Sequence, residues 1–502
     1  MRILLLTFLL SFPVLFAAQE NEKIFFGQKK ILKTPLENGD ILMSNYSYNN
    51  IFSIEKYSNG KICDTKFEKK INPIKGNNYK NGTYEPVAQI FNMNNKLFLL
   101  WEEWEEKSTT FFGQEMTTDL KLIGEKKMLA NYKNDNVRVS ISKSKESDNH
   151  EFFSINHFTQ SNKTKSTLLQ FAVIDANLNI INNGTYNLFW YEDNLSNYVE
   201  FPECHLTNNG DLFTIDNIYG VGDHKNTFQN LRLHQWVDNT DKSTDLFFTM
   251  EARYSTPFLS SNATHLYITG RVESSKLDAW GNYKQNNLGL YSFLYNCKDQ
   301  KVGDMMFDDL HNVLLKSEGT KGYTEQSSFG NVVKCILKDN NETIIFLENR
   351  FRSVEGLQYS YKVTILNKDA SDSLLWSQLI NKKQCSKFIG YDATCILPEH
   401  NGKTILFFND SKLNYDANGL FIESGIKINE AGFDKKNLVY IMAEIDMKSG
   451  ELISRKILYN YDNKEFVTRS AFYNDNNPLK ITFINTNKYG MKGNFSTLEI
   501  KE

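Results

Sequence analysis

The sequence has few of the features that mark common sites and domain boundaries. Only 8 of its 502 residues are proline, and no stretch rich in proline, glycine and serine marks a linker between domains. None of the 6 cysteines forms a CxxC pair, which argues against a zinc ribbon or a thioredoxin-like site. No GxSxG nucleophile motif is present. The sequence therefore favours one continuous domain and offers no motif of a catalytic centre.

The sequence also has no large excess of positive or negative charge. The formal net charge is -3, and no long run of like charges occurs. Binding to nucleic acid requires a basic patch or stripe, so we expect no nucleic-acid partner. The hydrophobic share of 40% and the aromatic share of 13% suffice for a large core, which excludes intrinsic disorder. No apolar run after the N-terminus reaches the roughly 18 residues of a membrane span, so no transmembrane segment is predicted.

The N-terminus has the pattern of an export signal. Arg2 supplies the positive end, residues 3–16 are apolar, and Ala17 and Ala18 are small residues suited to cleavage. We expect a signal peptide over residues 1–18, followed by a single, monomeric domain over residues 19–502. The localisation predicted is periplasmic, cell-surface or extracellular.

One short phrase recurs along the chain and is clearest at residues 391–410, YDATCILPEHNGKTILFFND. It predicts a short strand, an Asn-Gly turn and a second, alternating strand, because both turn residues tolerate positive φ. A third and a fourth strand usually follow, as in NLVYIMAEIDMKSG and LISRKILY. The turns are anchored at Asn38, Asn95, Asn149, Asn209, Asn262, Asn341, Asn401 and Asn477. Their spacing, from 53 residues (209 to 262) to 79 (262 to 341), is typical of propeller blades with insertions.

Four strands in meander order, repeated around a ring, make a β-propeller. A single copy cannot bury both of its faces, so each copy is stable only between neighbours. We therefore predict an all-β fold, a β-propeller of four-stranded antiparallel blades. Eight blades are expected, with seven as the alternative because degenerate repeats are easily miscounted. The last unit stops after FSTLEI, and we expect the N-terminal segment 23–29 to supply its outer strand and close the ring.

Connection lengths divide the predicted propeller into two faces. The turns between first and second strands and between third and fourth strands are short. The connections at 272–287, 411–436 and 308–328 are long and all lie on the opposite face of a meander blade. Long insertions in a compact domain are usually functional or disordered. This long-loop face is the predicted working surface.

Two tryptophans are the predicted ligand contacts. The stretch WEEWEEK at 101–107 suggests an aromatic and acidic platform for a sugar or a cation. The alternative places Trp101 in the blade core with the glutamates solvated. Trp104 and Trp280 are the tryptophans expected in loops of the working face, where a ring can stack on a ligand at little cost in side-chain entropy.

The cysteines and histidines can each be interpreted as a functional site or as ordinary structural residues. Cys335 and Cys395 occupy matching places in successive repeats, which suggests a disulfide between neighbouring strands or two small residues at equivalent core positions. His205, His224 and His234 fall within one repeat, and three histidines can hold a metal. Their spacing matches no ligand signature, so we expect solvated or hydrogen-bonded histidines, no metal site and no cofactor.

The C-terminal half resembles uncharacterised exported β-propeller-like proteins of Bacteroidetes-type bacteria. The phrases that carry the resemblance are LLWSQLINKKQCS at 374–386, ILFFNDSKLN at 405–414 and IMAEIDMKSGELISRKILY at 441–459. The resemblance covers about a quarter of the chain and implies a cell-envelope or secreted setting. The cysteines at positions 385 and 395 depart from it.

Three functions follow as hypotheses. The sequence favours an exported binding or scaffolding module for an unknown protein or glycan ligand, and so favours a protein that is not an enzyme. A carbohydrate-active hydrolase or lyase with acids converging at the central channel is the first alternative. A structural cell-envelope protein is the second.

Overall fold

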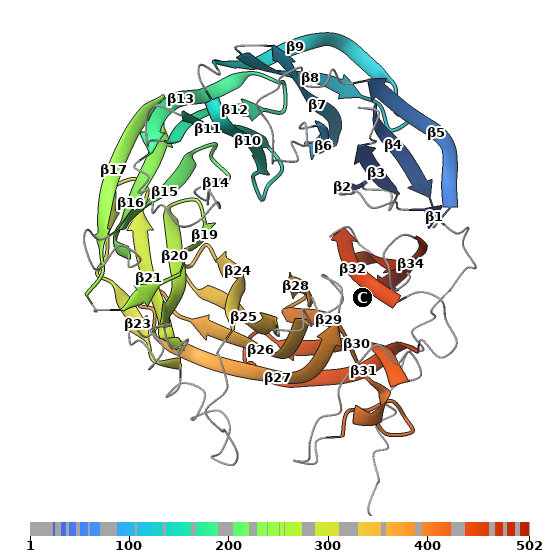
Figure 1. The fold of residues 1–502 in the computed structure, drawn as a ribbon. Coiled ribbons are helices and arrows are strands. Elements are labelled where there is room, and N and C mark those ends of the chain that lie inside the picture. Colours follow the sequence, from blue (N-terminus) through green and yellow to red (C-terminus); the bar gives the residue numbers. More distant parts are fainter. Residues whose placement is uncertain are drawn as a thin grey trace, which may run out of the picture.

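The fold is described from a computed structural model of the chain, shown in Figure 1. The residues that the structure describes are 24–25, 32–36, 40–46, 51–58, 61–70, 88–105, 108–133, 137–161, 167–188, 204–219, 228–237, 239–249, 252–255, 257–273, 287–310, 330–352, 358–386, 394–422, 437–460, 467–474, 479–486 and 492–500. The predicted signal peptide at residues 1–18 lies outside this part, so its existence and the single domain over 19–502 stay predictions.

Nearly all of the described chain is β-strand, arranged as antiparallel sheets of consecutive strands. The strands of the first four sheets are β2 (Leu32–Pro35), β3 (Ile41–Tyr46), β4 (Ile51–Ser58) and β5 (Lys61–Lys70); β6 (Ala88–Met93), β7 (Lys96–Glu105), β8 (Ser108–Met116) and β9 (Leu122–Lys133); β10 (Val137–Glu146), β11 (Phe152–Ser161), β12 (Thr167–Asp175) and β13 (Ile180–Leu188); and β14 (Cys204–Leu206), β15 (Leu212–Tyr219), β16 (Phe228–Val237) and β17 (Thr240–Phe247).

The strands of the other four sheets are β18 (Arg253–Tyr254), β19 (Phe258–Ser261), β20 (His265–Glu273), β21 (Asn287–Asn296), β22 (Lys301–Val302) and β23 (Met306–Asp308); β24 (Asn331–Leu337), β25 (Thr343–Arg352), β26 (Gln358–Lys368) and β27 (Leu374–Ser386); β28 (Cys395–His400), β29 (Lys403–Ser411), β30 (Leu438–Asp446) and β31 (Leu452–Asn460); and β32 (Val467–Asn474), β33 (Leu479–Thr486) and β34 (Lys492–Ile500), with β1 (Ile24–Phe25). The fifth sheet has six strands because its first and fourth positions are each divided in two.

The sheets follow one another around a ring in chain order (Figure 1). This arrangement confirms the predicted all-β propeller of four-stranded antiparallel blades. Eight sheets are present in the described residues, and β1 pairs with β34 through Ile24 with Gly493 and Phe25 with Lys492. Only two residues of the predicted closing segment 23–29 make this pairing, so the blade count and the closure of the ring stay predictions.

The core lies between the sheets, and the second strands of the second to the seventh sheets each pack against two neighbouring sheets. In β25, Ile344 and Phe346 pack toward the following sheet, whereas Ile345 and Leu347 pack toward the preceding one. Successive side chains of a strand point to opposite faces, and both faces are buried here. The second strands therefore read as continuous apolar runs such as TIIFL, KTILFF and KLFLLW. Seven such clusters join successive sheets in the described part of the chain.

The turns show a chemistry that the Asn-Gly pattern predicts only in part. Asn401 and Gly402 do form a two-residue turn with positive φ of 51° and 72°. Many other turns are five residues long and begin with a side chain that accepts backbone N–H groups. In the β12–β13 turn, Asp175 Oδ1 accepts from the N–H groups of Asn177 and Asn179 at 2.8 Å each, and Leu178 has a φ of 60°. In these turns an Asp, Ser or Thr at the first position, and not an Asn-Gly pair, stabilises the turn.

The strand boundaries confirm the difference between the two faces. Connections between first and second strands and between third and fourth strands are at most five residues long, as in 338–342 and 369–373. By contrast β20 ends at Glu273 and β21 starts at Asn287, and β29 ends at Ser411 and β30 starts at Leu438. The described residues include one short 3₁₀ helix, η2 (Lys412–Asn414), and no helix there has the length and apolar character to cross a membrane.

Candidate functional site

The two predicted ligand contacts are placed only in part. Trp104 lies in β7, where its backbone pairs with Thr109, and the position of its side chain is outside what the structure describes. Trp280 lies outside the described residues, between β20 and β21. The assignment of these two residues as ligand contacts therefore stays a prediction.

Trp101 of the WEEWEEK stretch lies in the interface between the first two sheets. Trp101 is buried, its Nε1 donates to Glu103 Oε1 at 2.9 Å, and Lys69 Nζ of the preceding sheet lies 3.8 Å from its ring centroid. The expected position of Trp101 in the core is confirmed. The expectation that the glutamates are all solvated is wrong, because Glu102 is fully buried and Glu103 also pairs with Lys126 at 2.9 Å. Strand alternation past Trp101 turns Glu102 toward the next sheet.

Cys335 and Cys395 do not approach each other. Cys335 is a free thiol packed between its own sheet and the preceding one. Cys395 packs into a cluster shared with the following sheet. The two residues thus face away from the interface that their sheets share, and the structure does not contain the suggested disulfide. Their positions fit small residues in two separate parts of the core.

Two of the three histidines, His205 and His234, lie in the part of the chain that the structure describes. His205, on β14, shares a hydrogen with Ser261 Oγ at 2.8 Å, and burial is the main cause that lowers its pKa to about 4. His234 lies on β16 between carboxylates, and His224 is outside the described residues. Among the residues that can be placed, no group of three or more His, Cys, Asp or Glu side chains could hold a metal ion.

Asparagine side chains join successive first–second turns on the tight-turn face. Each bond links one sheet to the next, and together they run from the third sheet to the sixth. The contacts are Asn149 N–H to Asn208 Oδ1 at 2.9 Å, Asn209 Nδ2 to the Ala263 carbonyl at 3.1 Å, and Asn262 Nδ2 to the Lys338 carbonyl at 2.7 Å and to Asn341 Oδ1 at 2.8 Å. An amide suits this role because it both donates and accepts. The face with short turns is thus bonded from sheet to sheet.

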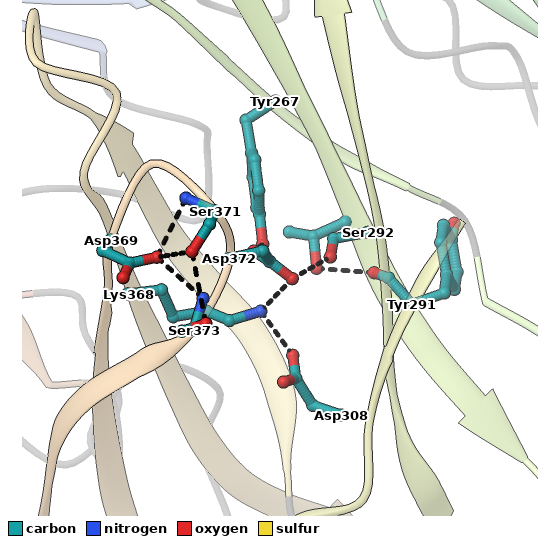
Figure 2. Close-up of polar contacts among 10 residues, drawn as sticks. Tyr267, Tyr291, Ser292, Asp308, Lys368, Asp369, Ser371, Asp372 and Ser373 are labelled. Atoms are coloured by element: carbon teal, nitrogen blue, oxygen red, sulfur yellow. Dashed lines mark hydrogen bonds and ion pairs between the residues drawn. The ribbon is translucent and has the colours of Figure 1, made fainter. Parts of the chain in front are cut away.

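A buried lysine forms a larger link between the fifth and sixth sheets (Figure 2). Lys368, at the end of β26, donates to Asp308 of β23 at 2.6 Å and also contacts Asp372. Asp372 in turn accepts from Tyr267 Oη at 2.7 Å and from Ser292 Oγ at 2.9 Å. The side chains come from β20, β21 and β23 on one side and from the β26–β27 turn on the other.

The electrostatics of this lysine group favour a structural role. Burial raises the pKa of Asp308 in spite of the nearby ammonium, and burial together with the charge of Asp372 raises the pKa of Tyr267. The Lys368 side chain is 1% exposed and Asp372 is 6% exposed, so a substrate would find neither group open. The carboxylates are held by a cation and hydroxyl donors, which fixes the two sheets together.

A second group of buried charges lies toward the long-loop face. Asp410, near the end of β29, pairs with Arg455 Nη2 of β31 at 2.6 Å. It also accepts from Tyr415 Oη at 2.7 Å and from Asn414 Nδ2 at 2.8 Å. Burial, and then the Asp410 charge, raise the pKa of Tyr415, so the phenol stays protonated as a donor. Asp410 thus joins the chain immediately after β29, through Asn414 and Tyr415, to Arg455 of β31.

A further buried pair connects this group to the preceding sheet. Lys382 of β27 contacts Glu348 of β25, and both are fully buried. Thr394 Oγ1 donates to Glu348 Oε1 at 2.7 Å. Arg455 Nη1 reaches across to the Asn381 carbonyl at 2.7 Å. The two ion pairs form a rigid polar base beneath the long-loop end of the sixth and seventh sheets.

Residues 411–422, called here the 411–422 arm, stand on this base. The arm leaves β29 at its long-loop end and turns back along the outer strand β31, where Leu420 forms an antiparallel bridge with Lys456. The ring of Phe421 lies 3.6 Å from the Arg455 guanidinium carbon. The arm exposes three large apolar side chains, Leu413 at 57%, Leu420 at 56% and Ile422 at 45%. Their backbone is held while their side chains face solvent.

The 411–422 arm was only partly predictable. The long connection at 411–436 marked its position on the working face, but residues 423–436 lie outside the described part. Sequence reasoning missed Asp410 and Arg455, because they are 45 residues apart and meet only through sheet pairing. The one available signal was the NDSKLNYD stretch, in which polar groups interrupt the end of an apolar strand.

No protein-family model and no curated protein matches the chain. Several solved structures do: Sqt1 of Saccharomyces cerevisiae is 10% identical with a TM-score of 0.40, covering 96% of this chain and 98% of Sqt1. The β-propeller domain of the Trilobed protease from Pyrococcus furiosus is 10% identical with a TM-score of 0.36, covering 84% and 96%. Prolyl oligopeptidase B from Galerina marginata is 10% identical with a TM-score of 0.35, covering 91% of this chain and 56% of that one. At this identity the likeness concerns the fold alone, and no activity follows from it.

Proposed function

We propose that the protein is an exported binding or scaffolding β-propeller that takes a partner on its long-loop face. The 411–422 arm carries this proposal. Its three exposed aliphatic side chains sit on a base of two buried ion pairs, whereas the tight-turn face is occupied by hydrogen bonds between its own sheets. A rigid apolar group needs little ordering when a partner binds, which is the condition for a useful contact.

The chemistry of the arm favours a protein partner over a glycan. Leucine and isoleucine side chains offer no hydrogen-bond donors or acceptors and no aromatic ring for a sugar to stack on. They suit an apolar patch on another folded protein, with the polar residues Lys412 and Asp416 at the rim. Trp104 and Trp280 remain the positions where a glycan would be tested.

The test compares two sets of exposed aliphatic residues. The variant Leu413→Ser/Leu420→Ser/Ile422→Ser removes the apolar surface of the arm. The control Leu374→Ser/Leu375→Ser/Ile453→Ser changes residues on the outer strands β27 and β31 that are exposed by 37%, 51% and 49%. Proteins captured from a cell-envelope extract are quantified by mass spectrometry. The arm variant should lose a protein that the wild type and the control both retain.

Two results would contradict the proposal. Equal loss of the captured protein in the arm variant and the control would show that general surface hydrophobicity, and not the arm, mediates capture. Binding on a glycan array that disappears in Trp104→Ala or Trp280→Ala, with no protein lost in the arm variant, would indicate a carbohydrate-binding function instead.

A further inference from the structure

His234 occupies an unusual place among the buried histidines. It lies on β16 with its ring fully buried. Its Nδ1 atom is 3.1 Å and 3.2 Å from the two carboxylate oxygens of Asp241 on β17. Its Nε2 atom is 3.4 Å from Asp216 Oδ2 on β15, within ion-pair distance but without hydrogen-bond geometry. Each ring nitrogen therefore faces a carboxylate from a different neighbouring strand.

Only one protonation state satisfies this arrangement. A neutral imidazole has one N–H and one lone pair, so it would direct a lone pair at a carboxylate in a buried place. The imidazolium donates from both nitrogens and carries the charge that both carboxylates attract. The site is thus complementary to a cation.

The other charged groups around the ring determine the net charge of the site. Arg232, also on β16, is held by Asp245 of β17 at 2.6 Å. Three carboxylates, Asp216, Asp241 and Asp245, therefore face one guanidinium and the histidine. With His234 protonated the group carries a net charge of -1 (three negative, two positive); with it neutral the net charge is -2.

The ring of His234 is also a contact between two sheets. Tyr186 of β13, in the preceding sheet, has its ring centroid 4.4 Å from that of His234. Trp236 lies on the same strand as His234 and stacks at 6.3 Å. An aromatic ring attracts a cation placed against its face, and this attraction disappears when the imidazole loses its charge.

We propose that His234 is held as an imidazolium between Asp216 and Asp241 and acts as a pH-responsive latch between the sheet β10–β13 and the sheet β14–β17. Below the pH at which the imidazolium loses its proton, both carboxylates and the Tyr186 ring hold His234. Above it, the loss of the cation between Asp216 and Asp241 weakens the interface.

The sign of the pH dependence follows from linkage. Burial alone would lower the pKa of His234, but the nearby carboxylates of Asp216 and Asp241 outweigh burial and raise it. The stabilisation is therefore complete below the unfolded pKa of about 6.5 and is lost as the pH rises through the higher folded value. His157, whose ring Nδ1 lies 2.8 Å from Ser142 Oγ, shows the opposite: burial lowers its pKa to about 3.

The first test is an NMR titration of the full chain labelled with ¹⁵N-histidine. The His234 signal should show two protonated nitrogens at neutral pH and a midpoint above about 6.5. The variant Asp241→Asn should move that midpoint down by about 1 pH unit, because it removes one of the two attracting charges. A His234 midpoint at or below that of an exposed histidine would overturn the proposal.

The second test measures the latch itself. Between pH 6 and pH 9 the wild type should lose protection from hydrogen exchange in β16 and β13, and its Tm should fall more than that of His234→Gln. The control His205→Gln, at a half-buried histidine whose ring bonds to Ser261 Oγ, should keep the pH dependence of the wild type. If His234→Gln does not fold, Asp241→Asn supplies the comparison. An unchanged pH dependence in the variant that folds would overturn the proposal.

Discussion

At the scale of single residues, Asp372 combines an unusual backbone conformation with a buried negative charge. Asp372 has a φ of 63°, in the left-handed region that glycine and asparagine adopt most easily. Its carboxylate reaches Tyr267, Ser292 and Lys368 at the same time. The backbone strain is thus offset by contacts to the preceding sheet. Asp372 therefore stabilises the fold through its contacts with the preceding sheet.

The first prediction concerns Asp372. Replacement with glycine relieves about 1 kcal/mol of backbone strain but leaves Lys368 with only Asp308 as a carboxylate partner. Breaking a buried ion pair usually costs more than this relief, so Asp372→Gly should lower the free energy of unfolding by about 2 kcal/mol or more. His150, with a φ of 57° and an exposed side chain, is the control. His150→Gly should be neutral or slightly stabilising; equal effects in urea denaturation would contradict the role of Asp372.

The second prediction uses two glycines with the same backbone. Gly450 and Gly402 have φ of 77° and 72°, so alanine is strained at both by about 1 kcal/mol. A Cβ at Gly450 would also lie 2.5 Å from the Trp376 ring of the preceding sheet, whereas one at Gly402 would meet nothing within 4 Å. Gly450→Ala should therefore reduce stability by about 1–3 kcal/mol more than Gly402→Ala. Thermal unfolding of the two variants checks this difference.

At the scale of elements, the 411–422 arm shows how one segment depends on charges that are distant in the sequence. The arm packs Tyr415 and Phe421 into the apolar cluster between the sixth and seventh sheets, and the Asp410–Arg455 pair contacts Tyr415 and Phe421 from beneath. A buried pair of this kind adds little net stability compared with apolar residues, but it defines a geometry. The Asp410–Arg455 pair thus fixes the position of the arm relative to β31.

The third prediction removes the cation under the arm. Arg455→Met leaves Asp410 buried without its charge partner and should cost about 3–5 kcal/mol. We expect the arm to detach before the sheets unfold, seen as faster hydrogen exchange and proteolysis at residues 412–421. Lys403→Met removes a half-exposed cation, 40% exposed and 3.3 Å from Glu444, and should cost less than about 1 kcal/mol. An arm that stays protected in Arg455→Met would show that its apolar contacts suffice.

The elements themselves were largely predictable from the sequence, and the charged groups were not. The turn anchors at Asn95, Asn149, Asn209 and Asn262 all fall between first and second strands, because an apolar run, a polar turn and a second apolar run depend on neighbours in sequence. The burial of Glu102 and the position of His234 between Asp216 and Asp241 depend on which face of each strand these side chains occupy. A shift of one residue in the register reverses that face, so these contacts need the structure.

At the scale of the whole molecule, the sheets form an array in which the second to the seventh each pack against two neighbours. The alternating side chains of β7, β25 and β29 enter two clusters each. Removing one interface therefore exposes apolar surface on two sheets at once. Stability in such an array is nearly a sum of nearest-neighbour terms, and closing the ring adds one more interface.

The fourth prediction tests closure of the ring. Deleting residues 19–29 removes β1 from β34 and leaves the eighth sheet with an open outer edge. This truncation should lower the Tm measured by calorimetry and promote association through the open edge. Deleting residues 19–22, which ends before the paired residues, is the control and should leave the Tm unchanged. Equal Tm values for the two truncations would contradict closure by the N-terminal strand.

The hydrogen bond from Asn209 Nδ2 to the Ala263 carbonyl is also open to chemical change. Asn209 precedes Gly210, and an asparagine before glycine is prone to slow hydrolysis of its amide. The product is a carboxylate, which has no hydrogen to donate and would confront the Ala263 oxygen with a negative charge. Deamidation of Asn209 in stored protein should therefore break this bond, and a mass increase at Asn209 should accompany a lower Tm.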